Sequence, residues 1–345
     1  MQLKQWDTPG AGLADKVSFK DHSIPTRDND MLQARSYRPA GVQVNKEKTL
    51  PIYVHLHGGG FLFGTLESED ATCARMVSSL SDQGTDVVVL NVNYRHTPEH
   101  GYPTAWNDVQ DALFWIYEHL DEIGVDGERL VIGGISAGAM LALSTALAQV
   151  TTAANGSGNE GLARLPKIKG MVLIIPPTVH YACNAPQRQQ LKDASLSSYI
   201  QNADAPVLPF KRMELFMSLL RIPPEELVER NLRLNPGNAS PDEVRALPPA
   251  TFGVAGRDIL RDEGLLFAKM LAENGYLSLL FYEVVLSANG GRVPTSTNVF
   301  GGVPHGFRLY GDRLKVSKKW DEVMERGIKW ALDGPAPGPF EIHAF

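Results

Sequence analysis

The sequence Gly134-Ile135-Ser136-Ala137-Gly138 places one serine between two glycines, each of them two positions away. An apolar run at 130–132 precedes it, and a run of helix-forming residues at 139–150 follows it. This arrangement predicts a nucleophile elbow, in which a strained turn joins a strand to a helix and exposes the serine. Glycine is needed on both sides, because a larger side chain there would collide with the neighbouring backbone. Ser136 is therefore the candidate nucleophile.

Short apolar segments alternate with longer helix-like segments through most of the chain. Strands are predicted at 51–56, 86–92, 129–133, 171–175, 251–254 and 279–285. Helices are predicted at 70–80, 105–120, 139–150, 262–273 and 314–332. Most of the predicted strands are apolar without alternation, which is typical of strands covered on both faces. We therefore expect an α/β fold with a mostly parallel central sheet and helices on both faces.

One region interrupts this rhythm. Residues 181–245 contain no convincing strand and two short helical patterns, at 211–220 and 224–231, bounded by Pro and Asn. A helical insertion between two core strands is typical of a cap that covers a site at the sheet edge. We interpret 181–245 as a helical cap.

The core is then predicted to comprise residues 41–180 and 246–345. Residues 1–40 form an N-terminal segment that we expect to join the cap. The tract 287–303 is rich in Gly, Ser, Asn and Thr, which predicts a mobile loop.

The composition excludes several classes of protein. The chain has 345 residues, 43% of them hydrophobic, and a net charge of −6 without a basic cluster, so we expect no nucleic-acid partner. No stretch approaches about 20 uninterrupted apolar residues, so we expect no membrane span. Two cysteines, Cys73 and Cys183, cannot form a disulfide framework. With no secretory signal pattern at the N-terminus, these features predict a cytoplasmic protein. A homodimer is compatible with the sequence.

A serine hydroxyl becomes a strong nucleophile only when a base accepts its proton, so Ser136 requires a histidine and an orienting carboxylate. After a serine elbow of this kind, the acid and then the histidine follow along the chain. His305 and His343 are the two histidines that follow every plausible acid. His343 lies in a Pro/Gly-rich tail, where an imidazole would be hard to fix in place. His305, between the last predicted strand and the closing helix, is the predicted base.

The acid is expected at the carboxyl end of a strand, next to the serine. Asp258 follows the predicted strand 251–254 directly and meets this requirement. Asp262 and its neighbour Glu263 are the alternatives, but both lie at the start of a helix, where capping accounts for acidic residues without catalysis. We predict that Asp258 is the carboxylate that orients His305, the predicted base for Ser136.

The segment His57-Gly58-Gly59-Gly60 follows the first predicted core strand. Backbone N–H groups that point at a developing oxyanion stabilise it, and only glycine lets the main chain approach so closely. We predict an oxyanion hole formed by Gly58, Gly59 and Gly60 together with Ala137, which follows the nucleophile. A plain glycine-rich turn is the alternative.

Two other interpretations of this segment are weaker. A phosphate cradle would also need the lysine and Ser/Thr of a P-loop, which are missing. His55 and His57 could begin a metal site, but no partner cluster with ligand spacing follows them, so we expect neither a metal nor a cofactor.

The substrate pocket is predicted from large apolar side chains near the glycine segment and in the cap. They are Phe61, Leu62, Phe210, Met213, Phe216 and Met217. For each of them, packing against the core is an alternative role.

Taken together, four segments between residues 51 and 307 resemble one known family. They are the HLHGGGF segment at 55–61, the NYRHTPE segment at 93–99 with the residues that follow it to Asp108, the serine elbow, and the DILRDEG segment at 258–264 with His305-Gly306-Phe307. In this combination the chain resembles the hormone-sensitive-lipase-like branch of the α/β-hydrolases, the HGGG-type carboxylesterases. The resemblance implies an α/β-hydrolase fold with a cap over the site, an acyl-serine mechanism and no cofactor.

The chain departs from this family at two elbow positions. Family members usually have an acidic residue where Ile135 stands and a glycine where Ala139 stands. The tract 287–303 is also longer than the usual link to the histidine. Tyr94, Pro98 and Asp108 are expected to brace the loops around the site rather than to touch the substrate.

These observations predict a serine hydrolase that cleaves a carboxylic ester of a small to medium, partly apolar molecule. The alternative is a dehydratase, lyase or cyclase on the same scaffold, which would use the histidine as base and the oxyanion hole to stabilise an enolate. A third possibility is an inactive ligand-binding receptor, but such relatives have lost the catalytic histidine, and His305 is present.

Overall fold

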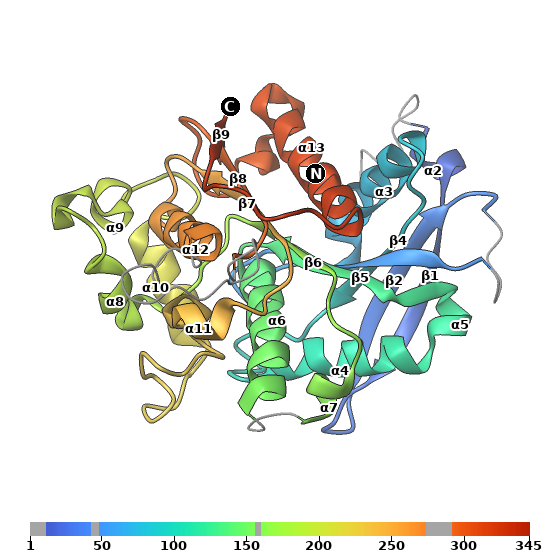
Figure 1. The fold of residues 1–345 in the computed structure, drawn as a ribbon, viewed down its shortest axis with the longest axis horizontal. Helices are drawn as coiled ribbons and strands as arrows, with labels where there is room; N and C mark the ends of the chain where they lie inside the picture. The colour runs from blue at the N-terminus through green and yellow to red at the C-terminus, as the bar shows by residue number, and fades with distance from the viewer. Residues whose placement is uncertain (1–11, 43–47, 156–159, 274–291) are drawn as a thin grey trace, which may run out of the picture.

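A single mixed sheet forms the centre of the molecule. The structure is a computed structural model that describes residues 12–42, 48–155, 160–273 and 292–345 (Figure 1). Within these residues the strand order is β1-β2-β4-β3-β5-β6-β7-β8-β9. The strands are β1 Val17–Pro25, β2 Met31–Pro39, β3 Leu50–Leu56, β4 Val88–Asn93, β5 Val125–Ile135, β6 Gly170–Ile174, β7 Ala250–Ala255, β8 Thr295–Phe300 and β9 Ile342–Ala344. All neighbours from β4 to β9 are parallel, whereas β1 and β2 pair antiparallel.

Helices surround this sheet. The α-helices are α2 Leu13–Lys16, α3 Leu66–Asp82, α4 Thr104–Glu118, α5 Leu120–Ile123, α6 Ala137–Asn155, α7 Glu160–Arg164, α8 Ala185–Arg188, α9 Ser198–Gln201, α10 Phe210–Leu219, α11 Pro241–Val244, α12 Arg261–Glu273 and α13 Val316–Leu332. Four short 3₁₀ helices of the described residues are η1 Tyr181–Cys183, η2 Ala194–Leu196, η3 Pro236–Asn238 and η4 Phe307–Arg313. The five longest helices overlap the five predicted helical segments, although α4 ends at Glu118 and α13 begins at Val316.

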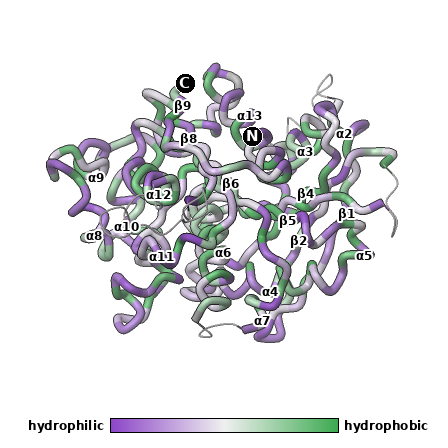
Figure 2. Tube along the Cα trace, in the orientation of Figure 1, coloured by the Kyte–Doolittle hydropathy of each residue, from purple (hydrophilic) through white to green (hydrophobic). Residues whose placement is uncertain are grey.

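The strands separate two apolar layers, because successive side chains of a strand point to opposite faces. In β3, Ile52 and Val54 belong to the layer that contains α4, α6 and α12. Tyr53, between them, belongs to the layer that contains α3 and α13. Figure 1 shows α3 and α13 on one side of the sheet and α4 and α6 on the other. Hydrophobic and hydrophilic residues alternate along outer helices such as α12 (Figure 2). The predicted α/β class is confirmed.

Helix α6 runs through the interior. Among the described residues, it is the helix whose length and composition would allow it to cross a membrane, over Ala137–Ala154. However, 78% of that stretch is buried inside the protein. This burial is expected of a core helix that follows a central strand.

Residues 181–245 lie between β6 and β7 and fold into short helices, seen beside α12 in Figure 1. The predicted helix at 211–220 is α10. The predicted helix at 224–231 is wrong, because these residues form separate turns. Asn231 Nδ2 donates to the Glu226 carbonyl at 2.9 Å, so this side chain occupies an acceptor that a continuing helix would use.

The prediction that residues 1–40 join the cap is wrong for the residues described. Residues 17–25 and 31–39 form β1 and β2, and β2 pairs with β4 at the edge of the central sheet. Along β2, the buried Leu32 and Ala34 alternate with the exposed Met31 and Gln33. This alternation is the strand signal that the sequence analysis overlooked.

The prediction of a mobile loop over 287–303 is also wrong in part. Residues 295–300 form β8, in which Thr295, Thr297 and Val299 supply the β-branched side chains that favour a strand. Their backbone pairs with β7 over its full length. The predicted strand at 279–285 lies outside the described residues.

Gly138, at the start of α6, is the position where a single methyl group should disturb the fold most clearly. A Cβ there would lie 2.1 Å from the Leu56 carbonyl oxygen, which is fixed in β3. We expect Gly138→Ala to lower the free energy of unfolding by about 3 kcal/mol, because backbone must move to admit the methyl group. Urea unfolding measures this change. Gly338→Ala is the matched control, since a Cβ there meets nothing within 4 Å; equal effects of both substitutions would contradict the prediction.

Glu325 should make stability depend on pH. It lies on α13, 8% exposed, and accepts a 2.6 Å hydrogen bond from Ser79 Oγ of α3. Burial raises its pKa to about 7 from 4.5. Between these values the folded chain holds a proton that the unfolded chain has lost, so the free energy of unfolding falls as pH rises, by about 3 kcal/mol in total.

The Glu325→Gln variant lacks this titrating group. We therefore expect its free energy of unfolding to rise relative to that of the parent protein as pH rises from 5 to 8, by about the amount that the parent loses. Urea unfolding across that pH range tests the expectation. Glu322→Gln on the same helix is the control, because the Glu322 side chain is 47% exposed and pairs with Lys319. Parallel stability curves for the parent and Glu325→Gln would refute the prediction.

Candidate active site

The elbow places Ser136 at the end of β5, one residue before α6. Its backbone has a φ of 53°, a left-handed conformation that a non-glycine residue adopts only under strain. Gly134 and Gly138 make the turn possible: a Cβ at either would lie within 2.2 Å of the Leu56 carbonyl oxygen. The Ser136 N–H donates to the Ile174 carbonyl at 2.8 Å, which ties the turn to β6.

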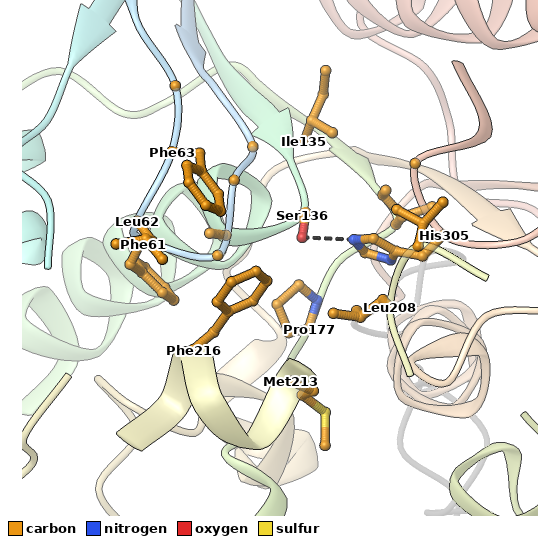
Figure 3. A pocket seen from close by; sticks show the side chains of 18 of the residues that line it. Phe61, Leu62, Phe63, Ile135, Ser136, Pro177, Leu208, Met213, Phe216 and His305 are labelled. Atoms are coloured by element: carbon orange, nitrogen blue, oxygen red, sulfur yellow. Dashed lines mark hydrogen bonds between the residues drawn. The ribbon is translucent and has the colours of Figure 1, made fainter. Parts of the chain in front are cut away.

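The structure brings together the three residues predicted from sequence order. Ser136 Oγ lies 2.9 Å from His305 Nε2, and His305 Nδ1 lies 2.7 Å from Asp258 Oδ2. In the tautomer that satisfies both contacts, the serine hydroxyl donates to Nε2 and the ring donates from Nδ1 to the carboxylate. All three residues are less than 9% exposed. Figure 3 shows Ser136 facing His305.

Asp258 is held by the turn that follows β7. Its Oδ1 accepts a hydrogen bond from the Leu260 N–H at 2.9 Å, and its carbonyl accepts one from Asn202 Nδ2 at 2.9 Å. One carboxylate oxygen is thus fixed by the backbone, and the other is left for His305. This division fixes the direction in which the imidazole ring points.

The alternative residues have other partners. Asp262 Oδ2 accepts the Ser198 N–H at 2.6 Å, and Glu263 Oε2 accepts the N–H groups of Thr178 and Val179. His343 lies on β9, exposed and paired with β8. Among the described residues, none of these three alternatives hydrogen-bonds to Ser136 or His305, so Asp258 and His305 remain the candidates.

Glu263 joins the loop after β6 to the helical segment 181–245. Besides the two backbone N–H groups, its carboxylate accepts a short hydrogen bond from the Tyr199 hydroxyl. Burial raises the pKa of Glu263 to about 7. The three donors offset part of this effect, because they stabilise the charged form. The residue therefore fixes the loop that carries Pro177 and Val179 along one side of the cavity.

The three glycines after β3 lie beside the serine and line the same cavity. Gly59 and Gly60 have φ values of 131° and 63°. A Cβ at Gly60 would lie 2.2 Å from the Phe216 ring, so only glycine fits under that side chain. Within the described part of the chain, no hydrogen bond uses the N–H of Gly59, Gly60 or Ala137. These donors are available to an anionic oxygen next to Ser136.

His55 and His57 take separate structural partners. His55 Nε2 lies 3.1 Å from Glu69 Oε2. The ring of His57 stacks on Tyr94 with centroids 4.3 Å apart, and burial lowers its pKa. In the ranges that the structure describes, no group of three or more metal-ligating side chains occurs.

The residues expected to brace the site lie behind the glycine loop. The Tyr94 hydroxyl donates to the His57 carbonyl at 2.8 Å. Asp108, fully buried, accepts hydrogen bonds from the Arg95 backbone N–H and guanidinium. Burial raises the pKa of Asp108, and Arg95 opposes that shift. Neither Tyr94 nor Asp108 lines the cavity.

A cavity of about 790 Å³ opens in front of Ser136. Five of the six predicted pocket residues line it, namely Phe61, Leu62, Met213, Phe216 and Met217. Phe210 does not line it, because its ring packs against Tyr181 and Tyr199 instead.

Sequence reasoning missed the opposite side of the cavity. Ile135 lies on the side of the serine away from Met213 and Phe216 (Figure 3). Helix α3 also contributes polar side chains to the lining, which include Glu69 and Thr72. No local motif marks these residues as part of a site, since they are far from Ser136 in the sequence.

Several known proteins with similar sequences are named as esterases. Residues 53–284 match a family described by its alpha/beta hydrolase fold. The esterase LipI of Mycobacterium tuberculosis is 34% identical over 65% of this chain and 61% of its own length, so the match spans about three fifths of that relative. The carboxylesterase NlhH of the same organism is 30% identical over 79% of this chain and 75% of its own.

Solved structures agree on the fold. The structure of vibralactone cyclase superposes with a TM-score of 0.76 and 25% identity, over 96% of this chain and 84% of the other. The chain therefore belongs to the α/β-hydrolase superfamily and, within it, to the hormone-sensitive-lipase-like carboxylesterases, a family of carboxylic ester hydrolases, as its motifs predicted.

Proposed function

We propose that this protein hydrolyses a carboxylic ester through an acyl-serine intermediate formed on Ser136. The observation that carries the proposal is the continuous hydrogen-bond chain from Ser136 Oγ through His305 to Asp258, with distances of 2.9 and 2.7 Å. A nucleophile, a base and a group that orients the base are the three components of such catalysis.

In the first half-reaction, Ser136 Oγ attacks the ester carbonyl carbon while His305 Nε2 accepts the hydroxyl proton. The N–H groups of Gly59, Gly60 and Ala137 stabilise the oxyanion of the tetrahedral intermediate, and loss of such a donor typically costs about 3 kcal/mol. His305 then gives the proton to the departing alkoxide oxygen, and the alcohol leaves. Asp258 holds the ring and stabilises its charged form.

In the second half-reaction, water attacks the acyl-serine while His305 accepts a proton from it. The same donors stabilise the second oxyanion, and the proton returns to Ser136 Oγ as the acid leaves. No cofactor takes part in this scheme. The substrate is a small to medium ester with an apolar part, because Phe61, Met213 and Phe216 form an apolar wall around a cavity of about 790 Å³.

A cyclase or lyase is the second candidate. The structural similarity to vibralactone cyclase favours it, since that protein shares the fold over most of this chain. On this alternative, His305 would act as base on a substrate that Ser136 positions without attacking it, and water would not be consumed. Product analysis in ¹⁸O-labelled water separates the two, because hydrolysis alone places solvent oxygen in the released acid.

Location and assembly stay predictions. Cys73 and Cys183 are both free and buried, which is compatible with the predicted cytoplasmic compartment. The homodimer suggested by the sequence can be tested by sedimentation of the purified protein.

Replacing the nucleophile should stop the reaction. We expect Ser136→Ala to lower kcat for p-nitrophenyl acetate by about 10⁴-fold or more, because the remaining groups cannot form an acyl-enzyme. Intact-mass analysis after exposure to a fluorophosphonate should show one adduct on the parent protein and none on the variant. An adduct that persists in Ser136→Ala would overturn the assignment.

The acid can be identified by a matched pair of substitutions. Asp258→Asn should lower kcat by about 10⁴-fold, because an amide cannot hold His305 in the required tautomer. Asp262→Asn, four positions away, should lower it less than tenfold, since Asp262 binds a backbone N–H of Ser198 instead. Initial rates of p-nitrophenyl acetate hydrolysis measure both losses. A larger loss of kcat in Asp262→Asn than in Asp258→Asn would contradict the assignment of Asp258 as the acid.

A further inference from the structure

The cavity has two chemically different walls. On α10, Met213, Phe216 and Met217 present apolar side chains. The same cavity is also lined by Thr65, the N-cap residue of α3, and by Ser68, Glu69 and Thr72 of α3. Their spacing of i, i+3, i+4 and i+7 places them along one face of the helix. A ligand in this cavity can therefore meet both hydrocarbon and polar groups.

Glu69 is the charged group of the polar wall that is most removed from water. Its side chain is 12% exposed, whereas that of Glu67 on the same helix is 51% exposed and lies 3.7 Å from Arg35. Within the described residues, the hydrogen bond to the Glu69 carboxylate comes from His55 Nε2 to Oε2, at 3.1 Å. The other carboxylate oxygen, Oε1, is left for a ligand.

His55 does not supply a compensating charge in this arrangement. The residue is fully buried, and its Nδ1 has no hydrogen-bond partner among the described residues. A neutral ring satisfies this geometry, since it donates from Nε2 and carries no hydrogen at Nδ1. An imidazolium would bury a second N–H without an acceptor, which is unfavourable.

Two arginines also line the cavity, and both donate to other residues. Arg308 donates two hydrogen bonds of 2.8 Å to the Asp321 carboxylate. Arg212 lies on α10 and donates to the Val207 carbonyl. The cavity lining therefore offers a largely buried carboxylate, and a buried carboxylate interacts with a cation more strongly than an exposed one does.

We propose that Glu69 binds a protonated amine of the substrate, so that the preferred substrates are esters that carry both an apolar part and an amino group. The inference rests on the proposed function of the site. Thr72, three positions along α3 from Glu69, also lines the cavity, whereas the Ser68 hydroxyl donates to the Thr65 carbonyl at 2.8 Å.

The test uses pairs of esters that differ in charge but not in shape. Dimethylaminoethyl butyrate and isoamyl butyrate place the amine or its carbon isostere on the alcohol side. The ethyl ester of γ-dimethylaminobutyric acid and its carbon isostere place the amine, or the carbon group that replaces it, on the acyl side. For at least one pair, we expect Glu69→Gln to lower the ratio of kcat/KM between the cationic and neutral members about tenfold or more. Asp82→Asn, which removes an exposed carboxylate at the far end of α3, should leave the ratio unchanged.

A second readout does not depend on turnover. Calorimetric titration with dimethylhexylamine should show about tenfold weaker binding to Glu69→Gln than to the parent protein. Unchanged ratios in both ester pairs, or equal amine affinity in the two proteins, would overturn the inference even if the neutral esters are hydrolysed normally. If no ester is hydrolysed, the proposed function is wrong, and the amine affinities alone decide whether Glu69 is a cation site.

Discussion

The contact between the elbow and the end of β3 is the constraint on which the site depends. The Leu56 carbonyl oxygen approaches Gly134 and Gly138 so closely that a Cβ at either position would lie within 2.2 Å of it. This contact sets two chain segments against each other: the loop with the three glycines, and the turn that exposes Ser136. The strained backbone of Ser136 is tolerated because β5, β6 and α6 fix both of its ends.

The parallel strands bring the other residues of the candidate site together. His305 lies 47 positions from Asp258 and 169 from Ser136, yet hydrogen bonds join all three. The strands β5, β7 and β8 run in the same direction, so the segments that follow them emerge at one edge of the sheet. The helical segment 181–245 reaches this edge from β6, and Glu263 links it to the core by accepting hydrogen bonds from Thr178, Val179 and Tyr199. The cavity and the candidate catalytic residues are thus held at the same edge of the sheet.

Much of this arrangement could be predicted, with failures that have physical causes. Most core strands are predictable because each is a short apolar run, and the long helices because each is a continuous helical pattern in the sequence. The sequence of the outer strands β1 and β2 predicts cap residues instead, since a half-exposed strand has a weaker signal than a buried one. Strand β8 was taken for a loop because its tract is rich in polar residues, whereas its pairing with β7 depends on a distant segment. The turns at 224–231 resembled a helix in composition alone.

The sequence by itself determined which residues can do chemistry. A serine in a tight turn, glycines that admit a close backbone and a histidine after the last strand are local requirements, and each leaves a motif of fixed spacing. Only the tertiary structure decided what surrounds them. Phe210 packs outside the cavity lining, Asp262 binds a backbone N–H, and Glu69 lines the cavity from a helix that no motif connects to the serine. These outcomes depend on packing between segments far apart in the chain, and a pattern within one segment cannot encode them.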